Sequence, residues 1–259
     1  MARKFMLVAG VLFVISLLLV ISFYPDWNTK ESEPYFGEKY FQDNSKRSPN
    51  YQVGDESHEI DSELYMEVTG VEVGGASLYA VVPRVKRGRS VLLLHGAAFS
   101  SRTWERLKTI DILIKANYHP VAVDLPGYGE SSRTAITNRN NFLSELIKKM
   151  GIEKPVIVSP SMSGRYSIPH LLHHADEMSG FVPISPVIDP TITPSDFKHV
   201  NVSTLIIYGE RDKGATEKNK LLSMIPGSKV VMIPNAEHPC YLDDPILFHN
   251  SLLNFLKTL

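Results

Sequence analysis

Short apolar runs, each bounded by turn-forming residues, recur along most of the chain. They are too short for helices, and their unbroken apolar character is typical of strands covered on both faces of a parallel sheet. We therefore predict one strand for each run. The runs are 90–94, 120–125, 156–158, 181–184, 204–208 and 229–233.

Amphipathic segments separate several of these runs. Residues 103–116 carry apolar side chains at helical spacing and are followed by Asn117, and residues 140–150 end at Gly151. Both endings are typical of helix stops. Strands that alternate with helices predict right-handed crossovers and a mostly parallel, doubly wound α/β sheet.

The first two strand-like segments follow a different pattern. Residues 64–69 and 76–82 have strand composition, and Gly74-Gly75 lies between them. A Gly-Gly pair suits a tight turn in which both residues have positive φ. We expect an antiparallel hairpin at the N-terminal edge of the sheet.

The N-terminal segment is uncharged from Phe5 to Pro25. As a helix its roughly 21 residues would span about 31 Å, close to the thickness of a bilayer core. No small-residue cleavage site follows, which favours an uncleaved signal anchor over a cleaved signal peptide. Arg3 and Lys4 precede the span, so the positive-inside rule predicts a single-pass type II protein with a lumenal or extracellular domain. A cytoplasmic domain stays open as the alternative.

The predicted organisation is a cytoplasmic start and transmembrane helix over residues 1–25, a polar stem over 26–61 and an α/β domain over 62–259. About twenty residues, 185–203, separate two predicted strands, so any lid inserted there is minimal. The sequon at Asn201 predicts a glycosylation site if it lies on a lumenal surface.

Charge and cysteine content narrow the range of partners. The 259 residues carry a formal net charge of −1, which gives no reason to expect nucleic acid as a partner. The single cysteine, Cys240, excludes an intrachain disulfide. Because it lies two residues from His238, a thiol nucleophile is a further alternative.

The segment Ser159-Pro160-Ser161-Met162-Ser163 follows a predicted buried strand. Small residues two places on either side of a central serine are typical of a nucleophile elbow, although serine replaces the commoner glycine at both places. Ser161 is the predicted nucleophile. The alternative is a helix N-terminus at which Ser161 or Ser163 only caps the helix.

Other strand ends supply the remaining chemistry in the order that a Ser–Asp–His hydrolase requires. We predict His238 as general base and then acid, and Asp212 as the carboxylate that orients it. The backbone amides of Ala97 and Met162 are the predicted oxyanion donors.

Several residues have alternative roles. Glu210 and Asp189 are rival acids, and Asp212 alternatively caps the following helix. We expect His95 to brace its loop and Asp124 to make structural hydrogen bonds. We expect no metal site, because the pair His173-His174 lacks further ligands.

Taken together, these motifs resemble the α/β-hydrolase domain-containing protein 14 family. The resemblance covers about residue 62 to the end, and its apolar N-terminus is similar to the membrane-anchored branch of the family. It rests on His95-Gly96, Asp124-Leu125-Pro126-Gly127-Tyr128-Gly129-Glu130-Ser131, Ser159-Pro160-Ser161-Met162-Ser163-Gly164, Tyr208-Gly209-Glu210-Arg211-Asp212 and His238-Pro239-Cys240-Tyr241-Leu242.

The resemblance implies an α/β-hydrolase fold and a serine hydrolase or acyltransferase of small acyl esters or acylated amines. The resemblance implies no required cofactor. For the soluble branch of the family it also implies removal of acetyl groups from lysine with coenzyme A as the acceptor, so coenzyme A is an alternative acyl acceptor to water. The alternative is a catalytically silent binding or scaffold protein on the same fold.

Overall fold

The computed structural model describes residues 64–259 and contains an eight-stranded mixed sheet with the order β1-β2-β4-β3-β5-β6-β7-β8. The strands are β1 (Tyr65–Val73), β2 (Ala76–Pro83), β3 (Ser90–Leu93), β4 (His119–Val123), β5 (Val156–Pro160), β6 (Gly180–Ile184), β7 (Leu205–Gly209) and β8 (Lys229–Ile233). The main helices are α3 (Arg102–Arg106), α4 (Thr109–Lys115), α5 (Arg139–Lys149), α6 (Gly164–His173), α7 (Pro194–Phe197), α8 (Ala215–Leu222), α9 (Cys240–Asp243) and α10 (Pro245–Leu256).

Strands β1 and β2 form the predicted antiparallel hairpin, which joins the sheet through antiparallel pairing of β2 with β4. Gly74 and Gly75 form its turn with φ of 57° and 81°, a conformation that residues with a Cβ adopt only at a cost. From β4 to β8 every neighbouring pair is parallel. The α/β-hydrolase fold with an N-terminal hairpin is therefore confirmed.

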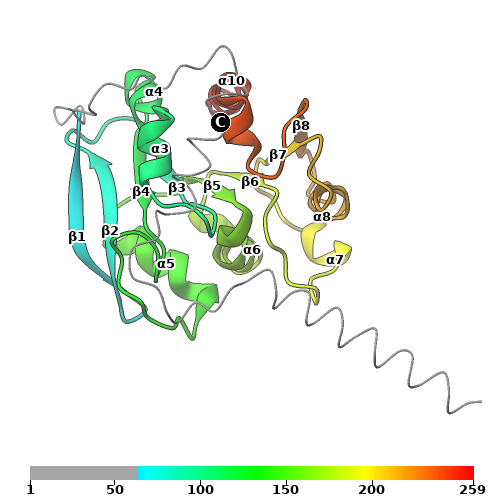
Figure 1. The fold of residues 1–259 in the computed structure, drawn as a ribbon. Coiled ribbons are helices and arrows are strands. Elements are labelled where there is room, and N and C mark those ends of the chain that lie inside the picture. Colours follow the sequence, from blue (N-terminus) through cyan, green and yellow to red (C-terminus); the bar gives the residue numbers. More distant parts are fainter. Residues whose placement is uncertain (1–63) are drawn as a thin grey trace, which may run out of the picture. The chain divides into compact units, whose positions relative to one another are not determined.

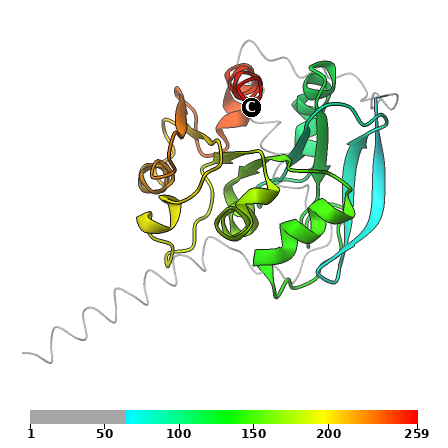
Figure 2. The ribbon, with the colours of Figure 1, turned by 180° about the vertical axis from the view of Figure 1, so that it is seen from behind.

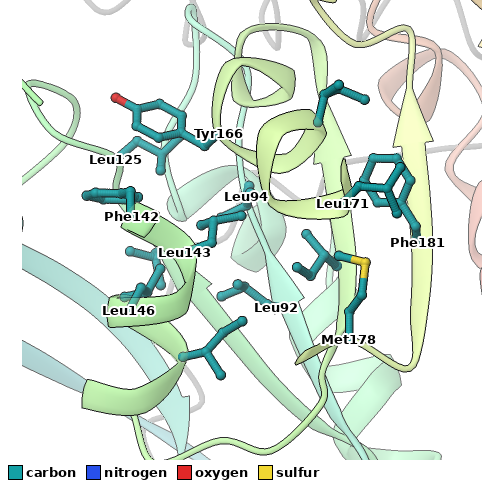
Figure 3. Packing of buried hydrophobic residues seen from close by; sticks show 14 of the residues in the cluster. Leu92, Leu94, Leu125, Phe142, Leu143, Leu146, Tyr166, Leu171, Met178 and Phe181 are labelled. Atoms are coloured by element: carbon teal, nitrogen blue, oxygen red, sulfur yellow. The ribbon is translucent and has the colours of Figure 1, made fainter. Parts of the chain in front are cut away.

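Helices cover both faces of the sheet (Figures 1 and 2). Successive strand side chains point to opposite faces, so Leu92 and Leu94 pack with α5 and α6, whereas Leu93 packs with α3, α4 and α10. Figure 3 shows the first of these clusters, in which Phe142 of α5 and Tyr166 of α6 lie with ring centroids 4.8 Å apart. Burial on both faces explains why the strands are uniformly apolar.

The prediction of a single helix over residues 103–116 was wrong. Lys108 has φ of 58°, which ends the right-handed helix and separates α3 from α4. Each half is held by a different partner: the Trp104 indole donates to the carbonyl of Leu94 at 2.9 Å, and the Thr109 hydroxyl bonds the His249 ring at 2.9 Å. The helical periodicity of the sequence does not encode this break.

The connection from β6 to β7 spans residues 185–204 and contains only the four-residue helix α7. The predicted transmembrane helix, the stem and the boundary at residue 62 lie outside the described residues. Within residues 64–259, no helix is long and apolar enough to span a bilayer.

Candidate active site

Ser161 lies directly after β5, at the start of a single 3₁₀ turn that leads into α6. Its φ is +50°, a left-handed conformation that costs a residue with a Cβ about 1 kcal/mol. The preceding loop approaches closely, since a Cβ built on Gly96 would lie 3.5 Å from the Ser161 Cβ. This strained strand-to-helix turn is the geometry expected of a nucleophile elbow.

The serines that replace glycine in the elbow form a buried hydroxyl network. The Ser159 hydroxyl lies 2.9 Å from that of Ser163 and 2.6 Å from that of Ser167, and Ser163 donates to the carbonyl of Pro160 at 2.7 Å. All three serines have no exposed surface. Their hydroxyls therefore tie the end of β5 to α6, and neither Ser159 nor Ser163 competes with Ser161 for substrate.

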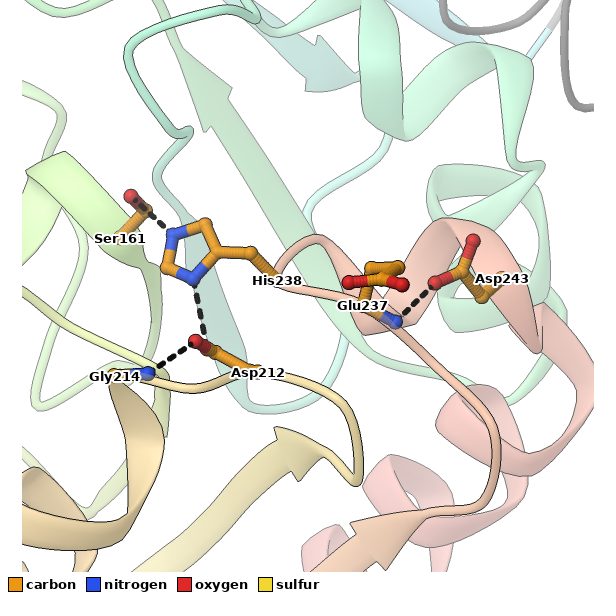
Figure 4. A network of polar contacts seen from close by, with 6 residues as sticks. All are labelled: Ser161, Asp212, Gly214, Glu237, His238 and Asp243. Atoms are coloured by element: carbon orange, nitrogen blue, oxygen red, sulfur yellow. Dashed lines mark hydrogen bonds and ion pairs between the residues drawn. The ribbon is translucent and has the colours of Figure 1, made fainter.

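Ser161, His238 and Asp212 form a continuous hydrogen-bonded line (Figure 4). The Ser161 hydroxyl lies 2.8 Å from His238 Nε2, and His238 Nδ1 lies 2.8 Å from Asp212 Oδ2. An ionised carboxylate only accepts hydrogen bonds, so Nδ1 carries the proton and Nε2 of the neutral ring accepts the serine proton. The His238 side chain is 44% exposed and that of Asp212 only 7%.

Asp212 is held in its ionised form. Burial alone would raise its pKa, but hydrogen bonding with His238, aided by the nearby Ser185 hydroxyl, lowers the pKa to about 2. Its second oxygen accepts from the amide of Gly214 at 3.1 Å. The carboxylate thus also makes the turn before α8 and points Oδ2 at the histidine.

The two rival acids bond elsewhere. Glu210 accepts from the amide of Asn235 at 2.8 Å, and Asp189 accepts from the amide and hydroxyl of Thr191. Hydrogen bonding with Thr191 lowers the pKa of Asp189. Of the three acids, the structure brings only Asp212 to the His238 ring.

The loop carrying His238 is fixed on both sides. The amide of Glu237 donates to Asp243 at 2.7 Å (Figure 4), and the amide of Arg211 donates to the carbonyl of Ala236 at 2.9 Å. The second bond joins the segment after β7 to the segment after β8, next to Asp212 and His238 respectively.

The amides of Ala97 and Met162 lie in the two loops next to the serine. Met162 follows Ser161 directly, and Ala97 follows Gly96, which lies close to the Ser161 side chain. Within residues 64–259, neither amide donates a hydrogen bond to another protein group. Neither amide is therefore occupied by a protein acceptor in this part of the chain.

His95 and Asp124 brace these loops, as expected. The amide of Leu125 donates to His95 Nε2, so Nδ1 bears the proton that His95 donates to the carbonyl of Gly96 at 2.8 Å. Burial lowers the pKa of His95, which keeps the ring neutral. Asp124 accepts from the amides of Ser101 and Glu130 and so joins two loops.

The remaining candidate residues lie apart from the line. Cys240 is fully buried and burial raises the pKa of its thiol, so it is not an accessible nucleophile. Among the described residues, no group of three or more His, Cys, Asp or Glu side chains is placed to hold a metal ion. Asn201 is exposed in the loop before β7, a position accessible to glycosylation.

Two residues near the line were not singled out from the sequence. Gly214 supplies the amide that fixes Asp212, and the spacing Asp212-Lys213-Gly214 is an Asx-turn signal that could have identified it. Ser185 lies in a left-handed conformation with φ of 45° after β6, for which the sequence offers no comparable signal.

Comparisons with known proteins agree with the fold. Residues 91–190 match the model of the alpha/beta hydrolase family. A crystal structure of a hydrolase from Thermoplasma acidophilum, described as CIB-like, superposes with a TM-score of 0.69 at 25% identity, covering 75% of this chain and 99% of that one.

Two curated relatives are more similar in sequence. Protein ABHD14A of Danio rerio is 41% identical over 184 residues, which cover 69% of this chain and 67% of the relative. The protein of Rattus norvegicus named "Putative protein-lysine deacylase ABHD14B" is 37% identical over 199 residues, which cover 73% of this chain and 95% of the relative.

Proposed function

The chain belongs to the ABHD14 family of α/β-hydrolases, and on that premise we propose that it is a serine hydrolase that forms an acyl-enzyme on Ser161. One observation carries the proposal. Ser161, His238 and Asp212 are joined by two hydrogen bonds of 2.8 Å, on a serine whose backbone is strained into an elbow. Such a line is what a weak hydroxyl nucleophile needs for activation.

In the proposed reaction the Ser161 oxygen attacks the acyl carbon while His238 Nε2 takes its proton. His238 then donates this proton to the departing oxygen or nitrogen, which leaves the acyl group as an ester on Ser161. Asp212 stabilises the cationic ring through Nδ1 and remains ionised. A water molecule, deprotonated by His238, attacks the ester, releases the acid and restores the serine.

The negative charge that develops on the acyl oxygen is stabilised by hydrogen-bond donors that have no other acceptor. We propose the amides of Ala97 and Met162 for this role, because neither donates elsewhere within the described residues. The loss of one such donor typically reduces the rate by about 10²–10³.

We propose small acyl esters or acylated amines, including acyl-lysine, as substrates. Two observations support this class. One is the name of the rat relative; the other is that His238 is exposed and that the β6–β7 connection contains only one short helix. Water is the proposed acceptor. Coenzyme A is the alternative acceptor, which analysis for an acyl thioester product would reveal.

We further propose a single-pass type II protein, anchored through the apolar residues 5–25 with its domain in the lumen or outside the cell. The exposed position of Asn201 is compatible with this orientation. A glycosidase-sensitive mass shift that Asn201→Gln abolishes is the expected result in cells. Modification of the domain by a cytosolic biotin ligase would contradict it.

The test compares hydrolysis of p-nitrophenyl acetate by the wild type, Ser161→Ala and His238→Ala. We expect both variants to lose at least about 10²-fold in kcat while their unfolding curves match the wild type. His199→Ala, an exposed histidine outside the hydrogen-bonded line, is the matched control and keeps full activity. A folded wild type that turns over no ester or acyl amine would instead indicate a catalytically silent scaffold.

A further inference from the structure

A cavity of about 500 Å³ lies beside the elbow, between the start of α5, the start of α6 and the loop after β6. Its lining combines apolar residues such as Ile168 with two exposed arginines, Arg139 and Arg165. Two cations lining one cleft next to a nucleophile need a functional explanation. We refer to this space as the arginine cleft.

One wall of the arginine cleft packs against the backbone of the nucleophile elbow. Its wall residue Val187 donates its amide to the Ser161 carbonyl at 2.7 Å, and Gly164, three residues after Ser161, lines the same wall. A Cβ on Gly164 would lie 2.4 Å from the Val187 carbonyl oxygen, so the two walls are in close contact. Arg165 follows Ser161 by four residues, roughly 6 Å of helical rise.

The charge of the arginine cleft favours an anion. Arg139 interacts with the Tyr166 hydroxyl, and neither Arg139 nor Arg165 takes part in an ion pair among residues 64–259. The opposing charge in the lining is Asp189, one of whose oxygens already accepts two hydrogen bonds from Thr191. Two planar guanidinium groups match a carboxylate, which they bind through charge-assisted hydrogen bonds.

The position of the arginine cleft indicates which part of a substrate enters it. Helices α5 and α6 pack on one face of the sheet, whereas Ala236 and Tyr241, two residues before and three residues after His238, pack on the other. The leaving group must lie near His238, which protonates it. An acyl group that points away from His238 would extend toward the other face of the sheet, on which α5, α6 and the arginine cleft lie.

We propose that Ser161 acts on acyl groups with a terminal carboxylate, of the succinyl to adipoyl type, and that Arg165 and Arg139 bind this carboxylate. The inference rests on the proposed function, since the anion belongs to the substrate of Ser161. The carboxylate takes no part in bond making. Ser161 becomes esterified by the other end of the diacid, and water then releases the free diacid.

The test measures kcat/KM for the mono-p-nitrophenyl esters of succinate, glutarate and adipate. Each is compared with the corresponding p-nitrophenyl methyl diester, in which the terminal carboxylate is masked and neutral. We expect the wild type to have a higher kcat/KM for at least one half-ester than for its neutral diester. Arg165→Gln and Arg139→Gln should each lower the kcat/KM for that half-ester about tenfold. Neutral esters are unaffected in both variants. Asp189→Asn removes the opposing charge and raises the half-ester value, and added salt weakens the preference.

Arg87→Gln, at an exposed arginine in the turn before β3, is the control and leaves both ester classes unchanged. The inference would be overturned if the wild type and both arginine variants had the same kcat/KM for half-esters as for neutral esters. A preference only for charge in the leaving group, measured with 4-acetoxybenzoate, would overturn the acyl-side assignment.

A binding measurement separates this inference from the proposed function. Calorimetric titration of Ser161→Ala with each half-ester requires no turnover, and we expect binding that Arg165→Gln in the same background abolishes. If the wild type proves inactive while this binding persists, the proposed function fails and the anion site stands. If turnover is normal but binding does not depend on Arg165, the anion site fails alone.

Discussion

The space around Gly209, at the end of β7, sets the distance between two members of the proposed triad. A Cβ at this position would lie 2.2 Å from the carbonyl oxygen of Glu237 and 2.4 Å from that of Ala236. Asp212 lies three residues after Gly209, and His238 follows Glu237 directly. Gly209→Ala therefore pushes apart the two segments that carry the acid and the base.

The magnitude follows from contact distances. Non-bonded carbon and oxygen atoms need more than 3 Å, so the segments must separate by about 1 Å. A misplacement of that size typically costs about 10² in rate, whereas such overpacking costs about 1–3 kcal/mol of stability. We expect Gly209→Ala to fold, as shown by a cooperative urea transition, and to lose about 100-fold in kcat/KM for p-nitrophenyl acetate.

Gly214→Ala is the matched control. The nearest atoms to its added Cβ are Asp212 Oδ1 at 3.6 Å and Lys218 Nζ at 3.8 Å, and the amide that bonds Asp212 is retained. We expect activity within about twofold of the wild type, because ordinary van der Waals contact requires no movement. Wild-type kcat/KM in folded Gly209→Ala would refute the idea that this spacing aligns Asp212 with His238.

Three further predictions concern single side chains. Asp212→Asn removes the acceptor that fixes the His238 tautomer, so kcat should fall by about 10³–10⁴ in steady-state kinetics; an unchanged kcat would exclude the role of Asp212. Ser159→Ala deletes the centre of the hydroxyl network and should cost about 1–3 kcal/mol in urea unfolding, whereas the exposed Ser223→Ala changes little; equal effects would contradict the network. Burial lowers the pKa of His249 to about 4, below its ordinary 6.5, so the unfolded state binds the proton first and stability falls as the pH drops from 6.5 to 4. The free energy of unfolding should fall by about 3 kcal/mol over this range because of His249 alone. His249→Gln should therefore reduce the pH dependence of the urea midpoint between pH 6.5 and 4, and an unchanged pH dependence would contradict this prediction.

Strands were easier to predict from the sequence than helices in this chain. An unbroken apolar run such as Val156–Val158 is unambiguous because both of its faces are buried. The break at Lys108 was not predictable, since it depends on contacts of Trp104 and Thr109 with distant residues. Local periodicity carries no information about such tertiary anchors.

The order of chemical residues along the chain predicted which side chains meet. Ser161, Asp212 and His238 follow different strands, and the carboxyl ends of parallel strands meet at one edge of the sheet. The order could not distinguish Asp212 from Glu210, because both follow β7; the hydrogen bond from Asn235 to Glu210 decides between them. The arginine cleft was not predicted, because its walls come from three separated segments.

The location of a covalent adduct tests the central claim most directly. After treatment with a fluorophosphonate, fragment-ion mass spectrometry of the wild type should locate one phosphonate on Ser161 itself and none on Ser163 of the same peptide. Ser161→Ala should carry none, and His238→Ala should react at least about 100-fold more slowly. A folded wild type without the adduct, or with the adduct on Ser163, would contradict the account.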